Sequence, residues 1–440
     1  MKSRLLWISA WLCMAAMSFA ARAAPTYEVV VVGGAGSAAY GINSTGQVVG
    51  QLKTAAGKHA FYFDGATLSD LGTLGGANSV AWSINDSGTV VGRANTAGNG
   101  LQAFVYSGGT LSALPAELYD ARSVNNAGTI VGTGYLPDGM GSDAARAYTY
   151  AGGVVTDLGI LPGNDGNESY GYGINNAGVA VGAVEVGGAP NRPTDPFLYS
   201  AGAMHNLGNI GGVFSQAWAI NSASQVVGAI GAPYLGDANV YPAKAFLWDA
   251  GVLHTLGEFI PNGNSIAYDI NDGGQVVGSA DTADGARAFL YAGSGMVALD
   301  TLIDPASGWT ITAANGINDL QQIAATACNL AGCYAVRLDL AAAVPEPGQS
   351  IMLGLGLLPL CMPALRRACR PACPSVRAHL RAGVAEHCLY AVNCRSSSMT
   401  GPRPPSSRAT KRSRPAALAW YSKSSAALIQ CADASSCALA

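Results

Sequence analysis

Cysteine is absent from most of this chain. None of the ten cysteines lies between Met14 and Ala327, so a framework of disulfides cannot stabilise the larger part of the fold. Within residues 25–341, which we call the body, only Cys328 and Cys333 occur. In an oxidising compartment we expect them to pair across one hairpin and to add about 2 kcal/mol of stability. Half of a metal site is the alternative for their CxxxxC spacing, but no further ligands follow at a suitable distance.

Charge is also scarce, and it is unevenly distributed. Only 12% of the residues are charged, 49% are hydrophobic and 57 of the 440 are glycine, which is too apolar for disorder and too rich in glycine for a helical protein. We therefore expect many short strands and turns. From Pro25 to Leu365 there are 9 basic and 25 acidic residues, a net charge near −16, which argues against nucleic acid as a partner.

The usual signatures of catalysis are missing as well. The body contains three histidines, His59, His205 and His254, at repeat positions where other polar residues stand in neighbouring copies. Its carboxylates lie mostly in turns. No GxSxG, HExxH, Walker or DxDxDG pattern is present, so we predict no catalytic residue, no cofactor and no metal site.

One stretch does resemble a cofactor motif. In YEVVVVGGAGSAAYGIN, from Tyr27 to Asn43, a run of valines precedes Gly34, Gly36 and Ala39 in the GxGxxA order of dinucleotide-binding proteins. However, the stretch aligns with GGANSVAWSIN and GGVFSQAWAIN further along the chain. A Rossmann helix would also have to continue through GINSTGQVVG, which favours a turn. We therefore interpret the stretch as the boundary of a repeat.

That repeat occurs seven times. Its copies are GINSTGQVVG, SINDSGTVVG, SVNNAGTIVG, GINNAGVAVG, AINSASQVVG, DINDGGQVVG and GINDLQQIAA. Their asparagines are Asn43, Asn85, Asn125, Asn175, Asn221, Asn271 and Asn318. Spacings of 40 to 50 residues suit one propeller blade better than one coil of a solenoid. Aromatic strands such as AFLY and short strands that contain LG complete most units.

The phase of the repeats predicts a closed ring. The seventh unit offers only three strands, ITAANGIN, QQIAATA and YAVRLDL, whereas the chain begins with one strand to spare, Tyr27 to Val32. Pairing of that strand beside Tyr334 to Leu340 would cover both edges of the array. We predict an all-β fold over residues 25–341, a seven-bladed β-propeller of about 46-residue repeats closed by its N-terminal strand. Another blade count or a β-solenoid is the alternative.

Two kinds of connection alternate along the repeats. The turn after each motif asparagine has a constant length, whereas the connection before the aromatic strand varies from nine to 16 residues in the copies compared. Alternate connections lie on opposite faces of a blade, so one face, the long-loop face, carries every long loop. We predict a binding surface there, formed by Tyr135, Asp138, Arg146, Arg192, Asp195, Tyr234, Tyr241 and Lys244. Aromatic planes beside hydrogen-bonding groups suit sugar rings or peptide segments, and ordinary solvated loops are the alternative.

The N-terminal segment predicts export. Residues 1–24 combine Lys2 and Arg4 with an apolar run and the small-residue end ARAA, which is typical of a secretory signal peptide cleaved after Ala24. A retained anchor is the alternative.

The segment that follows the body, residues 342–367, combines three features. It contains Pro345, Glu346 and Pro347, then an apolar stretch over 351–365, then Arg366 and Arg367. As a helix the 15 apolar residues would extend about 22 Å, short for a bilayer core of about 30 Å. Transient membrane insertion therefore fits better than a permanent anchor, and the two arginines would stay on the cytoplasmic side.

These phrases carry two resemblances. The GINxxGQVVG and AFLYxxGxxxDLGTLGG phrases resemble the HAF family of extracellular repeats over residues 27–340, which implies export and a surface role but no established chemistry. The segment 342–367 resembles the PEP-CTERM sorting signal. That resemblance implies an exosortase-type processing enzyme as partner, cleavage near the motif, and delivery to the cell surface or exopolysaccharide matrix of a Gram-negative bacterium. A proline-rich linker beside an incidental hydrophobic patch is the alternative.

The final 73 residues, 368–440, depart from that signal, which normally ends shortly after its arginines. This tail holds six of the ten cysteines, is rich in serine, arginine and proline, and contains no repeat phrase. We expect it to be disordered. An extended or frame-shifted reading of the gene is a second interpretation.

These observations favour an exported, non-enzymatic repeat protein that acts as a structural or binding module, with exopolysaccharide or a surface protein as partner. The alternative is a propeller enzyme that acts on extracellular glycans through carboxylates gathered at the axis.

Processing at both ends can be tested on the secreted protein. If both signals act, its intact mass corresponds to a chain that begins at Pro25, ends near Pro345 to Pro347, and lacks the apolar stretch 351–365. A secreted species that keeps residues 351–440 would contradict the sorting prediction and leave the signal peptide standing.

Overall fold

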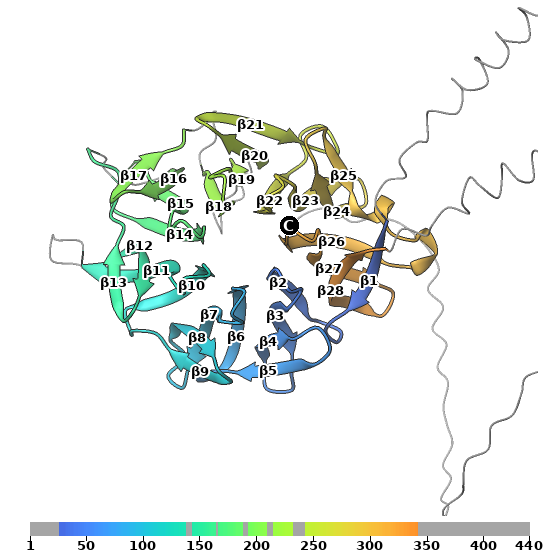
Figure 1. Ribbon diagram of the computed structural model, residues 1–440, viewed down its shortest axis with the longest axis horizontal. Helices are drawn as coiled ribbons and strands as arrows, with labels where there is room; N and C mark the ends of the chain where they lie inside the picture. The colour runs from blue at the N-terminus through green and yellow to red at the C-terminus, as the bar shows by residue number, and fades with distance from the viewer. Residues whose placement is uncertain are drawn as a thin grey trace, which may run out of the picture. The chain divides into compact units, whose positions relative to one another are not determined.

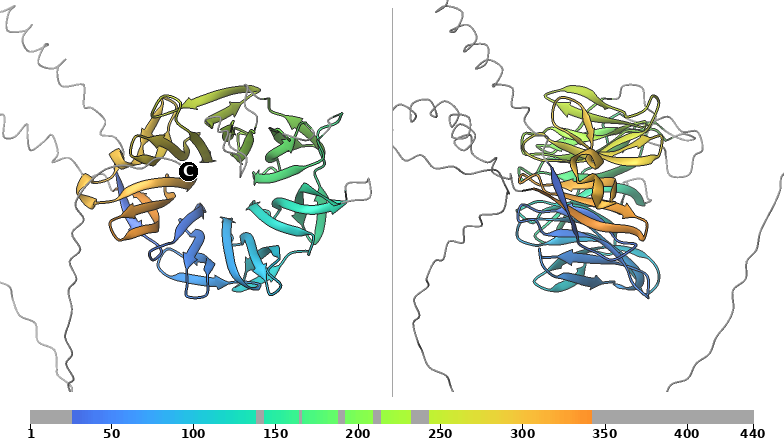
Figure 2. Two further views of the ribbon diagram at one scale, coloured as in Figure 1. Left: turned by 180° about the vertical axis from the view of Figure 1, so that it is seen from behind. Right: turned by 90° about the vertical axis from the view of Figure 1, so that its right-hand side faces the viewer.

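The protein is a ring of seven four-stranded antiparallel sheets around a central axis (Figure 1 and, from behind and from the side, Figure 2). The computed structural model describes residues 26–137, 143–163, 166–187, 192–208, 214–231 and 243–341. Each sheet is one blade, which confirms the predicted seven-bladed β-propeller. The predictions for the signal peptide 1–24, the sorting segment 342–367 and the tail 368–440 lie outside the described residues. No helix in the described ranges is long and apolar enough to cross a membrane.

Six blades are built from consecutive strands. Blade 1 contains β2 (Ala38–Ile42), β3 (Val48–Lys53), β4 (Lys58–Phe63) and β5 (Leu68–Gly72). Blade 2 contains β6 (Gly75–Ile84), β7 (Val90–Thr96), β8 (Leu101–Ser107) and β9 (Thr110–Ala113). Blade 3 contains β10 (Leu118–Val124), β11 (Ile130–Pro137), β12 (Asp143–Ala151) and β13 (Val154–Asp157). Blade 4 contains β14 (Ser169–Ile174), β15 (Ala180–Glu185), β16 (Thr194–Ser200) and β17 (Ala203–Asn206). Blade 5 contains β18 (Gln216–Ile220), β19 (Val226–Ile230), β20 (Lys244–Asp249) and β21 (Val252–Gly257). Blade 6 contains β22 (Ser265–Ile270), β23 (Val276–Thr282), β24 (Gly285–Tyr291) and β25 (Met296–Ala298).

The seventh blade joins the two ends of the body. It contains β26 (Thr310–Ile317), β27 (Ile323–Asn329), β28 (Gly332–Leu340) and, at its outer edge, β1 (Tyr27–Val31). The register between β1 and β28 runs from Tyr27 opposite Leu340 to Val31 opposite Val336, and Figure 1 shows the two strands side by side. This pairing confirms the predicted closure by the N-terminal strand, which gives both edges of the array a partner.

A ring of hydrogen bonds explains why every repeat has its asparagine. Each motif asparagine is buried at the end of an inner strand. Asn43 Oδ1 accepts from the backbone nitrogen of Gln47 at 2.9 Å, which closes the tight turn, and its Nδ2 donates to the Asn85 carbonyl at 3.1 Å. The same donation links each copy to the next around the axis, and Asn318 returns it to the Asn43 carbonyl at 2.9 Å. The seven amides therefore form a closed cycle that joins all the blades.

A glycine that recurs in the first six blades lets the strands approach closely. A Cβ on Gly50 would lie 2.1 Å from the Ala38 carbonyl oxygen and 2.8 Å from the Phe61 ring that packs over it. Blade 7 solves the same problem differently, because Ala325 stands in place of the glycine and is paired with Val336 instead of an aromatic residue. The methyl group of Ala325 thus finds room because Val336, which covers it, is smaller than an aromatic residue.

Buried serines fasten neighbouring blades. Ser79, on the inner strand of blade 2, donates to the Gly72 carbonyl and accepts from the Ala60 nitrogen of blade 1 at 2.7 Å. Ser169 and Ser265 make the same pair of bonds to the blades before them, and Ser37 accepts from Ala335 at the closure. The serine six positions before the motif asparagine therefore fastens its blade to the one before it.

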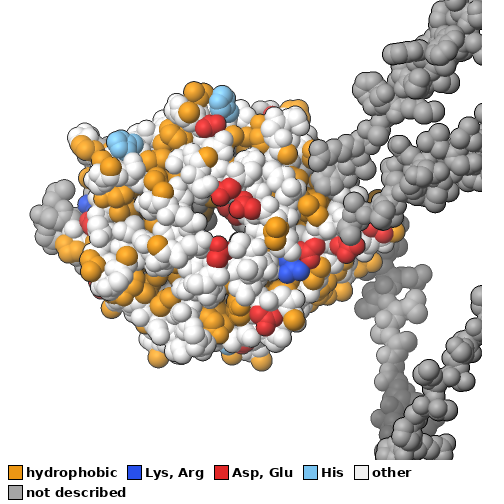
Figure 3. Space-filling view, viewed as in Figure 1, with side chains coloured by type: hydrophobic (Ala, Val, Ile, Leu, Met, Phe, Trp, Pro, Cys, Tyr) orange, Lys and Arg blue, Asp and Glu red, His pale blue; other side chains and the backbone are white. Residues whose placement is uncertain are grey.

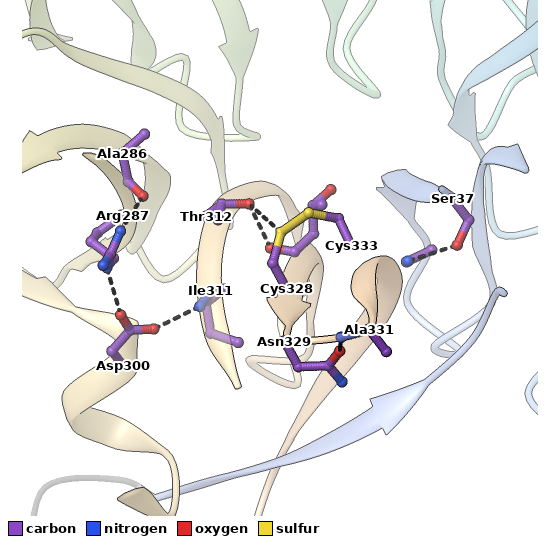
Figure 4. The surroundings of a disulfide bond; sticks show 12 residues. Ser37, Ala286, Arg287, Asp300, Ile311, Thr312, Cys328, Asn329, Ala331 and Cys333 are labelled. Carbon is purple, nitrogen blue, oxygen red and sulfur yellow. Dashed lines mark hydrogen bonds and ion pairs between the residues drawn. A yellow bond between two sulfur atoms is a disulfide. The ribbon is translucent and has the colours of Figure 1, made fainter. Parts of the chain in front are cut away.

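Blade 7 carries additional fastenings (Figure 4). Cys328 and Cys333 form a disulfide near the tip of the β27–β28 hairpin. Two short 3-10 helices, η1 (Leu299–Leu302) and η2 (Pro305–Ser307), connect blade 6 to blade 7. In η1, Asp300 pairs with Arg287 at 3.0 Å and accepts from the Ile311 nitrogen at 2.6 Å, so one carboxylate holds both blades.

The asparagine cycle predicts a difference between two adjacent residues. Asn125→Ala removes a buried amide and leaves the Asn175 carbonyl and two turn nitrogens without their partner, so we expect a loss of about 3 kcal/mol in the free energy of unfolding. Asn126→Ala removes the exposed amide next to it, and we expect less than about 1 kcal/mol. Chemical denaturation of both variants checks this, and equal losses would contradict the role given to the cycle.

Candidate functional site

The inner strands enclose two cavities on the axis of the ring. At the end where the asparagine turns lie, a cavity of about 210 Å³ is lined by the motif asparagines and the residues on either side of them. A second cavity, of about 180 Å³, lies on the side toward the long-loop face. The residue before each asparagine is aliphatic, and together these residues form a collar: Ile42, Ile84, Val124, Ile174, Ile220, Ile270 and Ile317. All seven line the first cavity, and four of them, Ile42, Ile84, Ile174 and Ile220, also line the second.

The mouth at the asparagine turns is polar and acidic. Asp86, Asp272 and Asp319 follow three of the motif asparagines and line this cavity, and Figure 3 shows acidic side chains around the central opening. These carboxylates are already engaged in the fold. Asp86 accepts from the Ser44 nitrogen at 3.0 Å, and Asp319 accepts from the Asp272 nitrogen at 2.8 Å. They continue the links between blades that the asparagines begin.

The second cavity, which we call the aromatic cavity, has a different lining. The residue three positions before each motif asparagine faces it, and five of these seven residues are aromatic: Tyr40, Trp82, Arg122, Tyr172, Trp218, Tyr268 and Asn315. The Tyr40 and Trp82 rings lie 4.9 Å apart, and those of Tyr172 and Trp218 lie 4.5 Å apart and nearly parallel. Burial raises the pKa of Tyr172 to about 12, so its hydroxyl stays neutral at physiological pH.

Arg122 occupies the gap in the aromatic series. Its guanidinium lies 4.3 Å from the Trp82 ring centroid and 5.8 Å from that of Tyr172, a cation–π arrangement on both sides. Buried Asp120 accepts from Arg122 Nε at 2.7 Å and from Trp82 Nε1 at 2.9 Å, and it also lies 3.5 Å from Arg93. One buried carboxylate thus serves two guanidinium groups and an indole, which holds this side of the cavity in one geometry.

The opposite side of the aromatic cavity carries groups with unused hydrogen-bonding capacity. Trp218 Nε1 is buried and has no hydrogen-bond partner among the described residues. In the next blade, Asp269 accepts from the Ile270 and Ile317 nitrogens at 2.9 Å each. Burial raises the pKa of Asp269 to about 7 despite these two bonds, and the nearby charge of Asp319 acts in the same direction.

The described members of the predicted loop surface come from three different blades. Tyr135 is 57% exposed on β11, and its ring lies 4.8 Å from that of Tyr119. Arg146 is buried on β12, with Nε 3.8 Å from Asp157 of the same blade. They belong to blade 3, whereas the other described candidates belong to blades 4 and 5.

Those other candidates also have partners within their own blades. Arg192 pairs with Glu185 at 2.8 Å and with Glu168 at 3.1 Å. Asp195 accepts from Asn206 at 2.7 Å. Lys244 forms an ion pair with Glu258 and donates to the Gly263 carbonyl at 3.0 Å. Asp138, Tyr234 and Tyr241 lie outside the described residues, so the loop-face surface stays a prediction.

The remaining titratable candidates are remote from the axis. His205 and His254 lie on the outer strands β17 and β21, and His59 Nδ1 lies 2.9 Å from Asp70 on the outer strand of blade 1. Within the described ranges, no group of three or more histidine, cysteine, aspartate or glutamate residues is arranged to hold a metal ion. The aromatic cavity is the feature that the sequence reasoning missed. Its signal is the aromatic residue that recurs three positions before the asparagine.

Several solved structures resemble this fold at low identity. The β-propeller domain of the Trilobed protease from Pyrococcus furiosus is 8% identical, with a TM-score of 0.43 over 70% of this chain and 96% of that one. The acylaminoacyl peptidase of Pyrococcus horikoshii is 12% identical, with a TM-score of 0.43 over 70% of this chain and 52% of its own. A gluconolactonase from Xanthomonas campestris is 12% identical, with a TM-score of 0.36 over 73% and 93%. These similarities say nothing about activity. No protein-family model and no curated protein sequence matches the chain.

The raised pKa of Asp269 predicts that the free energy of unfolding depends on pH. Its pKa is raised in the folded protein, so the folded state binds the proton more tightly than the unfolded chain does, and ionisation from about pH 4 to pH 7 lowers the free energy of unfolding. At about 1.4 kcal/mol per pKa unit, the loss is at most about 4 kcal/mol. Asp269→Asn lacks this term, so its stability relative to the parent rises across that range. Urea denaturation at several pH values checks this, and a constant difference would contradict it.

Proposed function

We propose that this protein is an exported, non-enzymatic module of the cell surface or extracellular matrix, and that it binds a glycan in the aromatic cavity. The observation that carries the proposal is the seven-membered ring of repeat-equivalent residues, mostly aromatic, which surrounds a cavity whose lining also includes the carboxylate of Asp269. Sugar rings present apolar C–H faces and hydroxyl edges, and aromatic walls with a few polar groups are complementary to both.

The fold holds the walls of the cavity in fixed positions, which suits a site that only binds its ligand. Arg122 is held by Asp120, and the asparagine cycle fixes the inner strands relative to one another. A site of this kind is preorganised, so binding costs little conformational entropy. The export route, the exosortase-type processing enzyme and the location in the matrix come with the proposal from the signal peptide and from the resemblance of residues 342–367 to a sorting signal.

The alternative, an enzyme that acts on extracellular glycans, is favoured by one observation. Asp269 lines the cavity, and a carboxyl group whose pKa is raised to about 7 is suited to donate a proton at neutral pH. Glycosidases ordinarily use a pair of carboxyl groups. Asp120, which lies behind Trp82 and Arg122, is occupied by the hydrogen bonds of those two residues.

The binding proposal is tested by retention of the secreted protein on exopolysaccharide from the producing cells. Tyr172→Ala removes an aromatic wall of the cavity, and we expect at least a tenfold weaker affinity, a loss of about 1.4 kcal/mol. The matched control is Tyr106→Ala on β8, where the ring lies 6.4 Å from Tyr62 in the neighbouring blade and away from the axis. Equal retention of both variants would reject the cavity as the glycan site.

A second measurement separates binding from catalysis. During prolonged incubation with the secreted protein, the polysaccharide keeps its chain length if the protein only binds it. Shortening that is abolished by Asp269→Asn would establish the enzymatic alternative.

A further inference from the structure

Arg122 is the one cationic side chain among the described residues that line the aromatic cavity. Its guanidinium carries N–H donors on Nε and on both terminal nitrogens, Nη1 and Nη2. Nε donates to buried Asp120 at 2.7 Å, whereas Nη1 and Nη2 make no hydrogen bond to any described residue. The side chain is 22% exposed, and neither terminal nitrogen is sealed from solvent. The terminal donors of Arg122 are therefore accessible to a ligand.

The charges around Arg122 do not cancel. Asp120 pairs with both Arg122 and Arg93, so two guanidinium groups against one carboxylate leave one net positive charge on this side of the cavity. Asp269, the acidic residue in the lining, comes from blade 6, three blades further around the ring. Salt screens charges beyond about 8 Å under physiological conditions, so the nearby guanidinium outweighs the negative charge of the body at this point. This wall of the cavity attracts a single negative charge.

The guanidinium of Arg122 is held in a fixed position before any ligand arrives. It lies 4.3 Å from the Trp82 ring centroid and 5.8 Å from that of Tyr172, and the bond from Nε to Asp120 sets its orientation. A guanidinium donates from a planar fork, and a carboxylate is planar and can accept two parallel bonds from it. Because the fork is already oriented, a carboxylate binds it at little cost in side-chain entropy.

The walls on either side of Arg122 select what carries the carboxylate. Tyr40 and Trp82 form one aromatic pair, with ring centroids 4.9 Å apart, and Tyr172 and Trp218 form the other, at 4.5 Å. A sugar ring offers C–H surface to such rings and hydroxyl groups at its edge. A neutral sugar would leave the charge of Arg122 without a counterion, and a small organic acid would not use the aromatic walls. A sugar that bears a carboxylate uses both.

The size of the cavity suits one such unit. Its volume of about 180 Å³ is below the roughly 300 Å³ at which pockets for drug-sized ligands begin. A single sugar residue is therefore a better match than a longer segment of a chain.

We propose that the aromatic cavity binds a uronic acid residue of an anionic polysaccharide, with the carboxylate of the sugar bonded to Nη1 and Nη2 of Arg122. The inference rests on the proposed function and names the class of its ligand. Arg122, which stands where five other blades place an aromatic residue, is then the residue that determines specificity for an acidic sugar.

The test compares two forms of one ligand. Exopolysaccharide from the producing cells is divided, and in one half the carboxyl groups of the sugars are reduced chemically to hydroxymethyl groups, which keeps the linkages and the other hydroxyls. Retention of the secreted protein is measured on both. We expect affinity for the reduced polysaccharide to be at least tenfold weaker, because the charge-assisted bonds to Arg122 are lost. This comparison needs no variant of the protein.

Two matched variants locate the effect on the protein. Arg122→Gln removes the guanidinium in the cavity, and we expect it to bind the native and the reduced polysaccharide equally, with at least a tenfold loss on the native form. Arg93→Gln removes the other arginine partner of Asp120, which lies outside the lining, and we expect a loss of less than threefold with the preference for the native form retained. Thermal unfolding establishes that both variants are folded.

Competition separates an acidic sugar from an acidic peptide. We expect the trisaccharide of galacturonic acid to displace the protein from native polysaccharide at a concentration at least tenfold lower than triglutamate, since only the sugar also fits the aromatic walls. Equal displacement by triglutamate would identify a general anion site and overturn the inference.

The other outcomes distinguish this inference from the proposed function. Equal retention of the parent on native and reduced polysaccharide, or equal losses in the two arginine variants, overturns the inference while glycan binding stands. If the parent is retained on neither polysaccharide, the proposed function fails and the inference fails with it.

Discussion

The whole structure depends on the cycle of amide hydrogen bonds that the seven motif asparagines form around the axis. Each side chain closes the turn of its own blade and donates to the backbone of the next, so local folding and assembly of the ring use the same residue. Because every donor and acceptor in the cycle is buried and paired, a blade that is out of register leaves polar groups unsatisfied on two neighbours. The cycle thereby fixes where each inner strand ends, and with it the height of the collar and of the aromatic cavity.

Much of the fold could be predicted because the same strand and turn pattern recurs in seven repeats. The constant distance from asparagine to glycine fixed the turn, and one spare strand at the beginning with one missing strand at the end predicted the closure between β1 and β28. Repeats that have lost the turn glycine still form the same turn. Ser224 and Gln321 adopt the positive φ that glycine adopts in the other five turns, because the surrounding hydrogen bonds impose that conformation on a less suitable residue.

The candidate site was harder to predict, for reasons that the backbone makes clear. A shift of register between Ala39 and Gly41 places a bulge at Tyr40, and equivalent irregularities occur in the other inner strands. Three consecutive residues, Tyr40, Gly41 and Ile42, then line the axis, which alternation along a regular strand does not predict. In the long loops, by contrast, the sequence suggested ligand-binding residues that turn out to have partners within the protein. Arg192 and Lys244 looked available to a ligand, but their partners Glu185 and Glu258 come from other loops and strands whose proximity the sequence does not state.

Departures from the repeat are what give the ring its chemical character. Seven equal blades would provide seven equal walls, whereas Arg122 and Asp269 make two of the walls charged and Asn315 makes a third an amide. Most contacts between blades rest on other positions, the asparagine and the serine, although Asp269 and Asn315 also bond to the next blade through the Ile317 nitrogen and the Ala39 carbonyl. The asparagine recurs in all seven blades, whereas the cavity residue three positions before it varies.

The pairing of β1 with β28 also has a consequence in time. The first strand of the body to leave the ribosome must wait for the last, since its strand partner β28 ends at Leu340 and the Ala341 nitrogen donates to the Thr26 carbonyl at 2.9 Å. Until then the nascent chain is an open array with an exposed edge at each end, held together by contacts between adjacent blades. Ring closure then joins positions more than 300 residues apart in one late event, so the finished molecule records that its entire body was synthesised.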